Sequence, residues 1–267
     1  MRRGVIALMG LSVFGAAPLG AQRQTEQNAF TWSARIPSGH WIRVRNLSGE
    51  INVIASNSDR VEVTATRQWR RSDPESVRFE VHKYGPNDED VVICAIWNDR
   101  TDCDENGYET HNESHNMRNN DVSVQFRVAV PRGVKVGVST VNGAVSVDGA
   151  TSEVEATTVN GEVEATSSGG PVNASTVNGS VTARMGRFDN DEDLNFSTVN
   201  GTVVAEFTGD LDADVELSTV NGRFHTDYPV TVNGRLDPRH LRARLGRGGR
   251  RIKLSTVNGN VELRRRG

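Results

Sequence analysis

The chain has 267 residues, a formal net charge of −3 and 24% charged residues, a balance that does not suggest nucleic acid as a partner. Its 26 glycines, its many valines and threonines and its 6% of aromatic residues favour an all-β protein. The length is sufficient for a hydrophobic core.

The first 21 residues, 1–21, are predicted to be a secretory signal peptide. Arg2 and Arg3 precede an apolar run at 5–14, and small residues at 16–21 lead to the expected cleavage point. The run is too short to span a bilayer, and no later stretch is apolar enough to be a transmembrane anchor. The mature chain is therefore expected to be exported to the periplasm, the outer surface or the medium.

Residues 22–133 are predicted to form an N-terminal β region that caps one end of the remaining chain. Alternation of apolar and polar residues predicts strands at 30–32, 41–44, 61–65, 77–81, 91–97 and 122–130. Residues 44–53 align with the repeat described next and are interpreted as a degenerate first copy. Residues 98–121 contain almost no apolar residue and are predicted to be a long polar loop.

Residues 134–267 contain a repeat with an insertion at 228–251. The sequence Ser-Thr-Val-Asn-Gly stands at 139–143, 175–179, 197–201, 218–222 and 255–259, and a sixth copy, 157–161, begins with threonine. The first five asparagines of these copies follow one another at intervals of 18, 18, 22 and 21 residues. A period near twenty residues is typical of stacked-repeat folds. Around each copy Val or Ala alternates with polar residues, which predicts two short strands joined by an Asn-Gly corner.

Two folds accommodate this unit. Because Asn-Gly between alternating strands is also a hairpin signal, an antiparallel β meander is the alternative. The predicted fold is a single-chain, all-β solenoid in which each copy stacks on the one before it at ~4.8 Å, since only stacking explains why the same residues recur. The asparagines would then form a hydrogen-bonded ladder, and each glycine would take a corner conformation with positive φ. The predicted structural residues are Asn142, Asn160, Asn178, Asn200, Asn221, Asn258, Gly143, Gly161, Gly179, Gly201, Gly222 and Gly259.

Four features of the sequence resemble one protein family. They are the signal peptide, Asn-x-x-Gly-x-Ile-x-Val at 46–53, Val-x-Ile-Cys at 91–94 and the repeated Thr-Val-Asn-Gly. Together they resemble the exported bacterial putative-adhesin family, proteins with a domain of unknown function and a β-solenoid fold. The resemblance covers most of the chain after residue 29. It implies a role in surface interaction and supplies no catalytic residues.

The sequence contains no nucleophile–base pattern, phosphate-binding loop or dinucleotide fingerprint. The predicted function is therefore that of a non-enzymatic surface or envelope protein, an adhesin-like interaction scaffold. Two alternatives remain open, a polysaccharide-acting enzyme on a solenoid and a purely structural envelope component. The expected partner is a component of the cell envelope or surface, with anionic polysaccharide as one candidate, and the sequence does not indicate an oligomeric state.

The chain has two cysteines, and its expected export predicts that Cys94 and Cys103 form a disulfide. Next to them, a group of side-chain oxygens has the calcium-loop spacing Asp-x-Asp-x-Asn-Gly-x5-Glu, although no helices flank it. These residues are Asp102, Asp104, Asn106 and Glu113. No cofactor is expected elsewhere, and calcium at this loop is a candidate.

The insertion carries the one basic cluster of the chain. Alternation of Leu241, Ala243 and Leu245 predicts that the arginines between them point outward. The cluster is a candidate site for an anionic ligand, and a solvated strand face covering the repeat is the alternative. Its residues are Arg242, Arg244, Arg247, Arg250 and Arg251.

Overall fold

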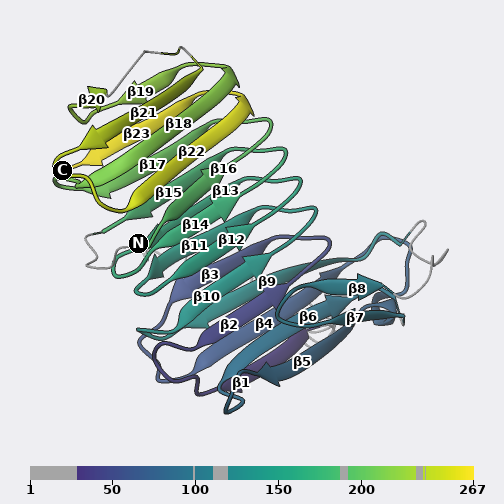
Figure 1. The fold of residues 1–267 in the computed structure, drawn as a ribbon. Coiled ribbons are helices and arrows are strands. Elements are labelled where there is room, and N and C mark those ends of the chain that lie inside the picture. The colour runs from purple at the N-terminus through teal and green to yellow at the C-terminus, as the bar shows by residue number, and fades with distance from the viewer. Residues whose placement is uncertain (1–28, 99, 111–119, 187–191, 233–236, 238) are drawn as a thin grey trace, which may run out of the picture.

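The protein is described by a computed structural model that covers residues 29–98, 100–110, 120–186, 192–232, 237 and 239–267. Two long sheets enclose one hydrophobic core, and the chain passes from one sheet to the other at regular corners. Figure 1 shows the resulting stack of short strands. Equivalent strands of successive copies pair in parallel, which confirms the predicted solenoid and excludes the antiparallel meander.

We call the two layers sheet A and sheet B. From the N-terminal end of the stack, sheet A consists of β1 (Ala29–Ala34), β4 (Val61–Gln68), β9 (Ser123–Val130), β3 (Ile51–Ala55), β11 (Val145–Ala150), β13 (Val163–Ser167), β15 (Val181–Met185), β17 (Val203–Thr208), β23 (Val261–Arg266) and β19 (Phe224–Thr226). In the same direction, sheet B consists of β5 (Arg78–Tyr84), β6 (Asp90–Ile96), β2 (Trp41–Arg45), β10 (Lys135–Ser139), β12 (Val154–Thr157), β14 (Val172–Ser175), β16 (Leu194–Ser197), β22 (Arg251–Asn258), β18 (Ala213–Asn221), β21 (His240–Leu245) and β20 (Thr231–Val232). A separate hairpin contains β7 (Thr101–Cys103) and β8 (Tyr108–Thr110), and a short 3-10 helix spans Pro74–Ser76.

A rung, meaning one strand of each sheet and the corner between them, buries the residues that alternation predicted to face inward. In one rung Val154, Ala156, Val163 and Ala165 are at most 1% exposed. Val154 pairs in register with the next rung's Val172, so like side chains stack on like. This in-register stacking keeps the hydrogen bonds between neighbouring rungs continuous. It also places the corner of each rung directly above the corner of the rung before it.

The degenerate first copy is a rung of the stack, because β2 and β3 pair in parallel with β10 and β11. Ser48 makes the backbone bridge to Asn142 that asparagine makes in later copies. Antiparallel strands β1, β4 and β5 close this end of the molecule. The ring of Phe79 stacks on Phe30, with centroids 4.7 Å apart, and meets Phe126 edge-on at 6.0 Å. The N-terminal region therefore covers the end of the core, as expected.

The last copy of the repeat does not lie at the end of the stack. Strands β22 and β23 are inserted between β16/β17 and β18/β19, and Figure 1 shows these yellow strands within the green part of the ribbon. The prediction that each copy stacks on the one before it is wrong at this point. The physical reason is that β21 pairs antiparallel along the outer edge of β18, after which the chain crosses to the inner edge as β22. The antiparallel strand covers a sheet edge that would otherwise be open to pairing.

Within the described ranges, no helix has the length and hydrophobicity needed to cross a membrane.

Candidate interaction surface

A buried threonine connects each corner to the adjacent rung. Its hydroxyl donates a hydrogen bond of 2.8–3.0 Å to the carbonyl oxygen of the adjacent corner glycine. The pairs are Thr140 to Gly49, Thr158 to Gly143, Thr176 to Gly161, Thr198 to Gly179, Thr256 to Gly201 and Thr219 to Gly259. All six threonines are at most 5% exposed, so this position of the repeat holds rungs together and is not available to a ligand.

The asparagines form a side-chain ladder along the corners. Every member after Asn142 donates from Nδ2 to Oδ1 of its neighbour toward the N-terminal end, at 2.7–2.8 Å. The donor–acceptor pairs are Asn160 to Asn142, Asn178 to Asn160, Asn200 to Asn178, Asn258 to Asn200 and Asn221 to Asn258. Because the last copy is inserted, Asn258 precedes Asn221 in the ladder. Each inner member both donates and accepts, which fixes its amide orientation.

Glycine is required at the corners because adjacent rungs approach closely. A Cβ atom added to Gly161, Gly179 or Gly201 would lie 2.0 Å from the carbonyl oxygen of the adjacent corner glycine. The prediction that every corner glycine has a positive φ is wrong, since Gly143, Gly161 and Gly222 lie outside the left-handed region. The requirement that all corners share is therefore space for the neighbouring backbone.

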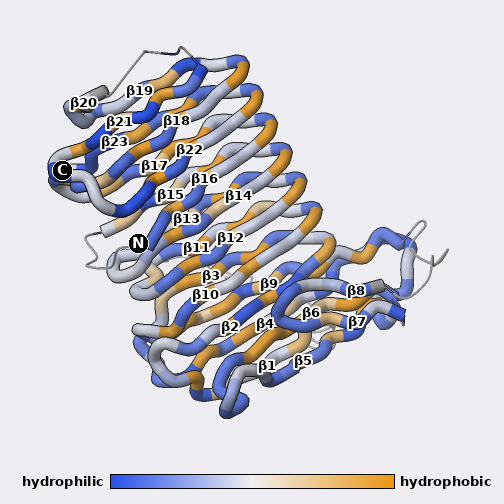
Figure 2. The backbone as a smooth tube through the Cα atoms, in the orientation of Figure 1, coloured by the Kyte–Doolittle hydropathy of each residue, from blue (hydrophilic) through white to orange (hydrophobic). Residues whose placement is uncertain are grey.

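The valine of each corner points outward and forms an apolar line beside the asparagine ladder. Five members are 37–50% exposed, namely Val159, Val177, Val199, Val257 and Val220. In Figure 2 hydrophobic segments recur along the right-hand corners of the stack. We call the six segments 140–143, 158–161, 176–179, 198–201, 256–259 and 219–222 the corner row. With threonine inside and valine outside, the corner row is a narrow, regular and uncharged edge of the molecule on which a line of valines runs beside a line of asparagines.

At the N-terminal end of the corner row, a longer segment of the chain connects β6 to β9, and its described residues are 97–98, 100–110 and 120–122. This segment carries the β7–β8 hairpin, and the expected disulfide joins Cys94 to Cys103. The Tyr108 hydroxyl donates to the carbonyl of Ala95 at 2.8 Å. The prediction of a loop without strands at 98–121 is wrong in part. The disulfide and Tyr108 pack against the outer face of β6 and form a second small core there. A count of the apolar residues in 98–121 did not predict these contacts.

Of the four residues with calcium-loop spacing, Asp102, Asp104 and Asn106 lie in the described part of the chain, and calcium binding by them stays a prediction. Asp104 accepts hydrogen bonds from the backbone N–H groups of Asn106 and Gly107, at 2.8 and 3.1 Å, and these bonds lower the pKa of its carboxyl. Asp102 lies on β7 opposite Glu109 of β8. Glu113 lies outside the described residues. Among those that are described, no group of three or more His, Cys, Asp or Glu side chains is placed to hold a metal ion.

Four arginines of the basic cluster lie within 4.0 Å of carboxylates. Strand β21 pairs with β18 so that Arg244 lies opposite Asp214, with Nε and Oδ1 3.2 Å apart. The other close pairs are Arg242 with Glu216 at 3.7 Å, Arg247 with Asp212 at 2.7 Å and Arg251 with Asp193 at 4.0 Å. Arg250 lies between Arg247 and Arg251 in the chain, and its backbone carbonyl accepts a hydrogen bond from the N–H of Asp214. The cluster is thus a surface of mixed charge, and its members on β21 lie along the outer edge of β18.

A second contact across strands lies on the outer face of sheet B. Arg43 on β2 crosses Gly137 on β10 to pair with Glu155 on β12, with Nη1 and Oε2 2.5 Å apart. Its guanidinium also lies 4.1 Å from the ring centroid of Trp41 and donates from Nε to the hydroxyl of Tyr84 at 2.9 Å. The absent side chain of Gly137 provides the space for this crossing, because an added Cβ would lie 2.8 Å from Nη1.

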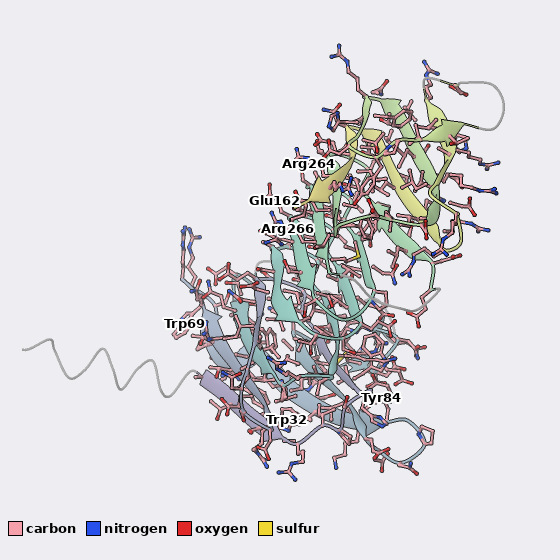
Figure 3. The ribbon with its side chains drawn as sticks, turned by 90° about the vertical axis from the view of Figure 1, so that its left-hand side faces the viewer. Trp32, Trp69, Tyr84, Glu162, Arg264 and Arg266 are labelled. Carbon is pink, nitrogen blue, oxygen red and sulfur yellow. A yellow bond between two sulfur atoms is a disulfide. The ribbon has the colours of Figure 1, made fainter. Side chains whose placement is uncertain are left out.

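Trp69 is an exposed aromatic side chain of the N-terminal part. Figure 3 shows Trp69, which is 40% exposed, and Tyr84 on opposite sides of this part. Trp69 lies in a shallow hollow with Arg70, Arg71 and Asp121. This hollow is remote in sequence from the repeat and shares no residue with the corner row.

A known protein family includes most of this chain, with its two facing sheets and repeated corners. The model of the family Toastrack DUF4097 matches residues 35–264. The chain belongs to this family. The Toastrack match begins before β2 and extends into β23, so it includes every rung described above.

Two solved structures are similar to this Toastrack chain. A putative cell adhesion protein from Clostridium sporogenes is 11% identical, with a TM-score of 0.50, over 89% of this chain and 100% of that one. A putative adhesin from Bacteroides fragilis is also 11% identical, with a TM-score of 0.37, over 89% of this chain and 97% of that one. At such identity the likeness to the first structure shows a shared fold and nothing further. No curated protein matches the chain.

The sequence analysis did not predict that the valines of the Toastrack repeat form an exposed line. The alternation pattern contains this information, because its continuation from Val154 through Ala156 places Thr158 inside and Val159 outside. A residue that is apolar, outward and repeated in every copy is unusual for a soluble surface and was the available clue.

Proposed function

We propose that this chain is an exported, non-enzymatic interaction scaffold of the cell envelope or surface, adhesin-like in its role. The observation that carries the proposal is the corner row, which presents Val and Asn side chains in line while Thr and Gly hold the rungs together. A row of identical units suits recognition of an extended partner, whereas catalysis needs different groups that converge on one reacting centre.

One observation, one prediction and one likeness motivate the proposal of export and a surface role. The disulfide between Cys94 and Cys103 is of the kind that persists in oxidising compartments outside the cytoplasm. The predicted signal peptide, residues 1–21, precedes the described part of the chain. The related fold from Clostridium sporogenes bears the name of a putative cell adhesion protein, and that name motivates the same role here.

The test is a pull-down with the mature chain, residues 22–267, against envelope fractions of the cells that produce it. The informative variant is Val177→Lys/Val199→Lys, which places two charges in the middle of the corner row. Val81→Lys is the matched control, because Val81 is 37% exposed but lies on β5, away from the row.

We expect the unmodified chain and the Val81 variant to retain the same envelope component and the double variant to lose it. Retention of nothing by any of the three would contradict the proposal. Equal retention by all three would contradict the assignment of the corner row as the binding surface.

A further inference from the structure

The exposed apolar side chains of this protein are concentrated in one place. Of the seven large hydrophobic side chains that are exposed among the described residues, five are valines of the corner row. The other two are Trp69 and Val81, in separate parts of the N-terminal region. A contiguous apolar patch on a soluble protein marks a surface that contacts another molecule.

The spacing of the row restricts what can fit it. Adjacent rungs are hydrogen-bonded in register, so the valines recur at the strand separation of ~4.8 Å. A partner that fills the gaps between them must carry apolar groups with the same repeat. A second copy of the row has that repeat by construction, and two rows placed antiparallel about a two-fold axis interdigitate along their length.

The charge of the row also favours a second copy. Its six segments, all within the described residues, contain only Thr, Val, Asn and Gly, so two copies meet without repulsion between like charges. The asparagine amides at the margin can exchange hydrogen bonds across the interface. The same composition lacks the cations that bind an anionic polymer and the aromatic rings that stack on flat ligands.

We propose that the corner row pairs two copies of this chain side by side, with their valine lines interdigitated and antiparallel. This inference rests on the proposed function and names the partner of the same surface. The row is a single line of valines, whereas specific stable complexes bury ~1,200–2,000 Å². Pairing is therefore weak in dilute solution and is strengthened where many copies are held on one surface, because each further contact becomes effectively intramolecular.

Sedimentation equilibrium of residues 22–267 over a wide concentration range tests the proposal directly. Two row variants are compared, Val177→Lys/Val199→Lys and Val177→Glu/Val199→Glu, with Val81→Lys as the matched control. We expect reversible dimers for the unmodified chain and the control, and a dissociation constant raised at least ~10-fold for each row variant alone. An equimolar mixture of the two row variants is expected to restore dimers, because opposite charges then face each other. Thermal melting monitored by circular dichroism verifies that every variant is folded.

Several outcomes would overturn the pairing. They are an unmodified chain that stays monomeric at every concentration, dimers that the row variants do not weaken, and a mixture that fails to associate. The envelope pull-down separates this failure from failure of the proposed function. A monomeric chain that still retains an envelope component through the corner row would refute the second copy as partner and leave the scaffold role standing.

Discussion

Asn258 donates a hydrogen bond from Nδ2 to Oδ1 of Asn200 at 2.7 Å, although 58 residues separate the two in the chain. Asn221 is much nearer to Asn200 in sequence but lies one rung further out, where it donates to Asn258 at 2.8 Å. The repeat makes this inversion feasible, because every copy offers the same corner to its neighbours. Because the copies are identical at the corner, the sequence predicts that an asparagine ladder forms. It does not predict the order in which the asparagines follow one another along the ladder.

The ladder predicts that the same substitution has different costs at its middle and at its end. Asn178 both donates to Asn160 and accepts from Asn200, whereas Asn142 accepts from Asn160 at its Oδ1. Asp can accept but its ionised carboxylate cannot donate. Asn178→Asp is therefore expected to lower the free energy of unfolding by ~1 kcal/mol, and Asn142→Asp by less. Urea unfolding of both variants at neutral pH measures the difference, and equal costs would contradict the donor directions.

The buried threonines predict a cost for removing one hydroxyl at constant shape. Thr176→Val deletes the bond to the Gly161 carbonyl and leaves that oxygen without this donor, so we expect a loss of ~1–3 kcal/mol in unfolding free energy. Thr157→Val is the matched control, because Thr157 is exposed on the outer face, and a change within ~0.5 kcal/mol is expected there. Chemical denaturation of both variants provides the comparison. Similar losses at the two positions would show that the corner bond is not what holds Thr176 in place.

The close approach of rungs predicts that a methyl group at a corner is poorly tolerated. In Gly179→Ala the added Cβ meets a backbone carbonyl oxygen at 2.0 Å, so the two rungs must separate. In Gly137→Ala it meets the side chain of Arg43, which can move at the expense of its contact with Glu155. We expect a markedly larger fall in melting temperature for Gly179→Ala than for Gly137→Ala, measured by calorimetry. The reverse ranking would mean that the corner can relax more easily than the arginine.

The disulfide predicts a stability loss that is centred on the β7–β8 hairpin. Cys94 and Cys103 are 9 residues apart, and for so short a loop the chain-entropy model gives about 2.5–3 kcal/mol. Replacing both by serine is expected to reduce the unfolding free energy by about this amount and to increase hydrogen exchange in β7 and β8 before it does so in the repeat. If exchange rose equally along the whole stack, the hairpin would not be the element that the disulfide secures.

Periodicity predicted most of the fold, because alternation around Val154 and Val172 reports which side of a strand is buried. The corner chemistry was predicted only in part. A run of Thr-Val-Asn-Gly shows that copies are equivalent, but the reason for glycine at Gly161 is the distance to a neighbouring backbone, which no single copy contains. The polar composition of 98–121 concealed the hairpin, since its stability comes from Cys103 and Tyr108 and their contacts with β6.

The order of the last two rungs could not be predicted from the sequence, because it too depends on contacts between copies. Either copy can supply Asn and Thr to the rung of β16, so local chemistry does not distinguish them. The choice depends on β21 and on the turn that follows it, where the N–H of Arg247 donates to Asp212 at 2.9 Å. That contact lowers the pKa of the Asp212 carboxyl and links the turn after β21 to the residue that precedes β18.

The most direct test of the stacked architecture is the pairing of engineered cysteines on its outer face. Ser197 and Ser255 are register partners on adjacent strands, while Ser218 lies one rung further out. Adjacent positions at ~4.8 Å are within the Cα–Cα range of a disulfide, and positions two rungs apart are not. Non-reducing peptide mapping by mass spectrometry is predicted to find a new disulfide in Ser197→Cys/Ser255→Cys and none in Ser197→Cys/Ser218→Cys. A disulfide in the second variant and not in the first would show that the copies stack in chain order and would contradict the inserted last rung.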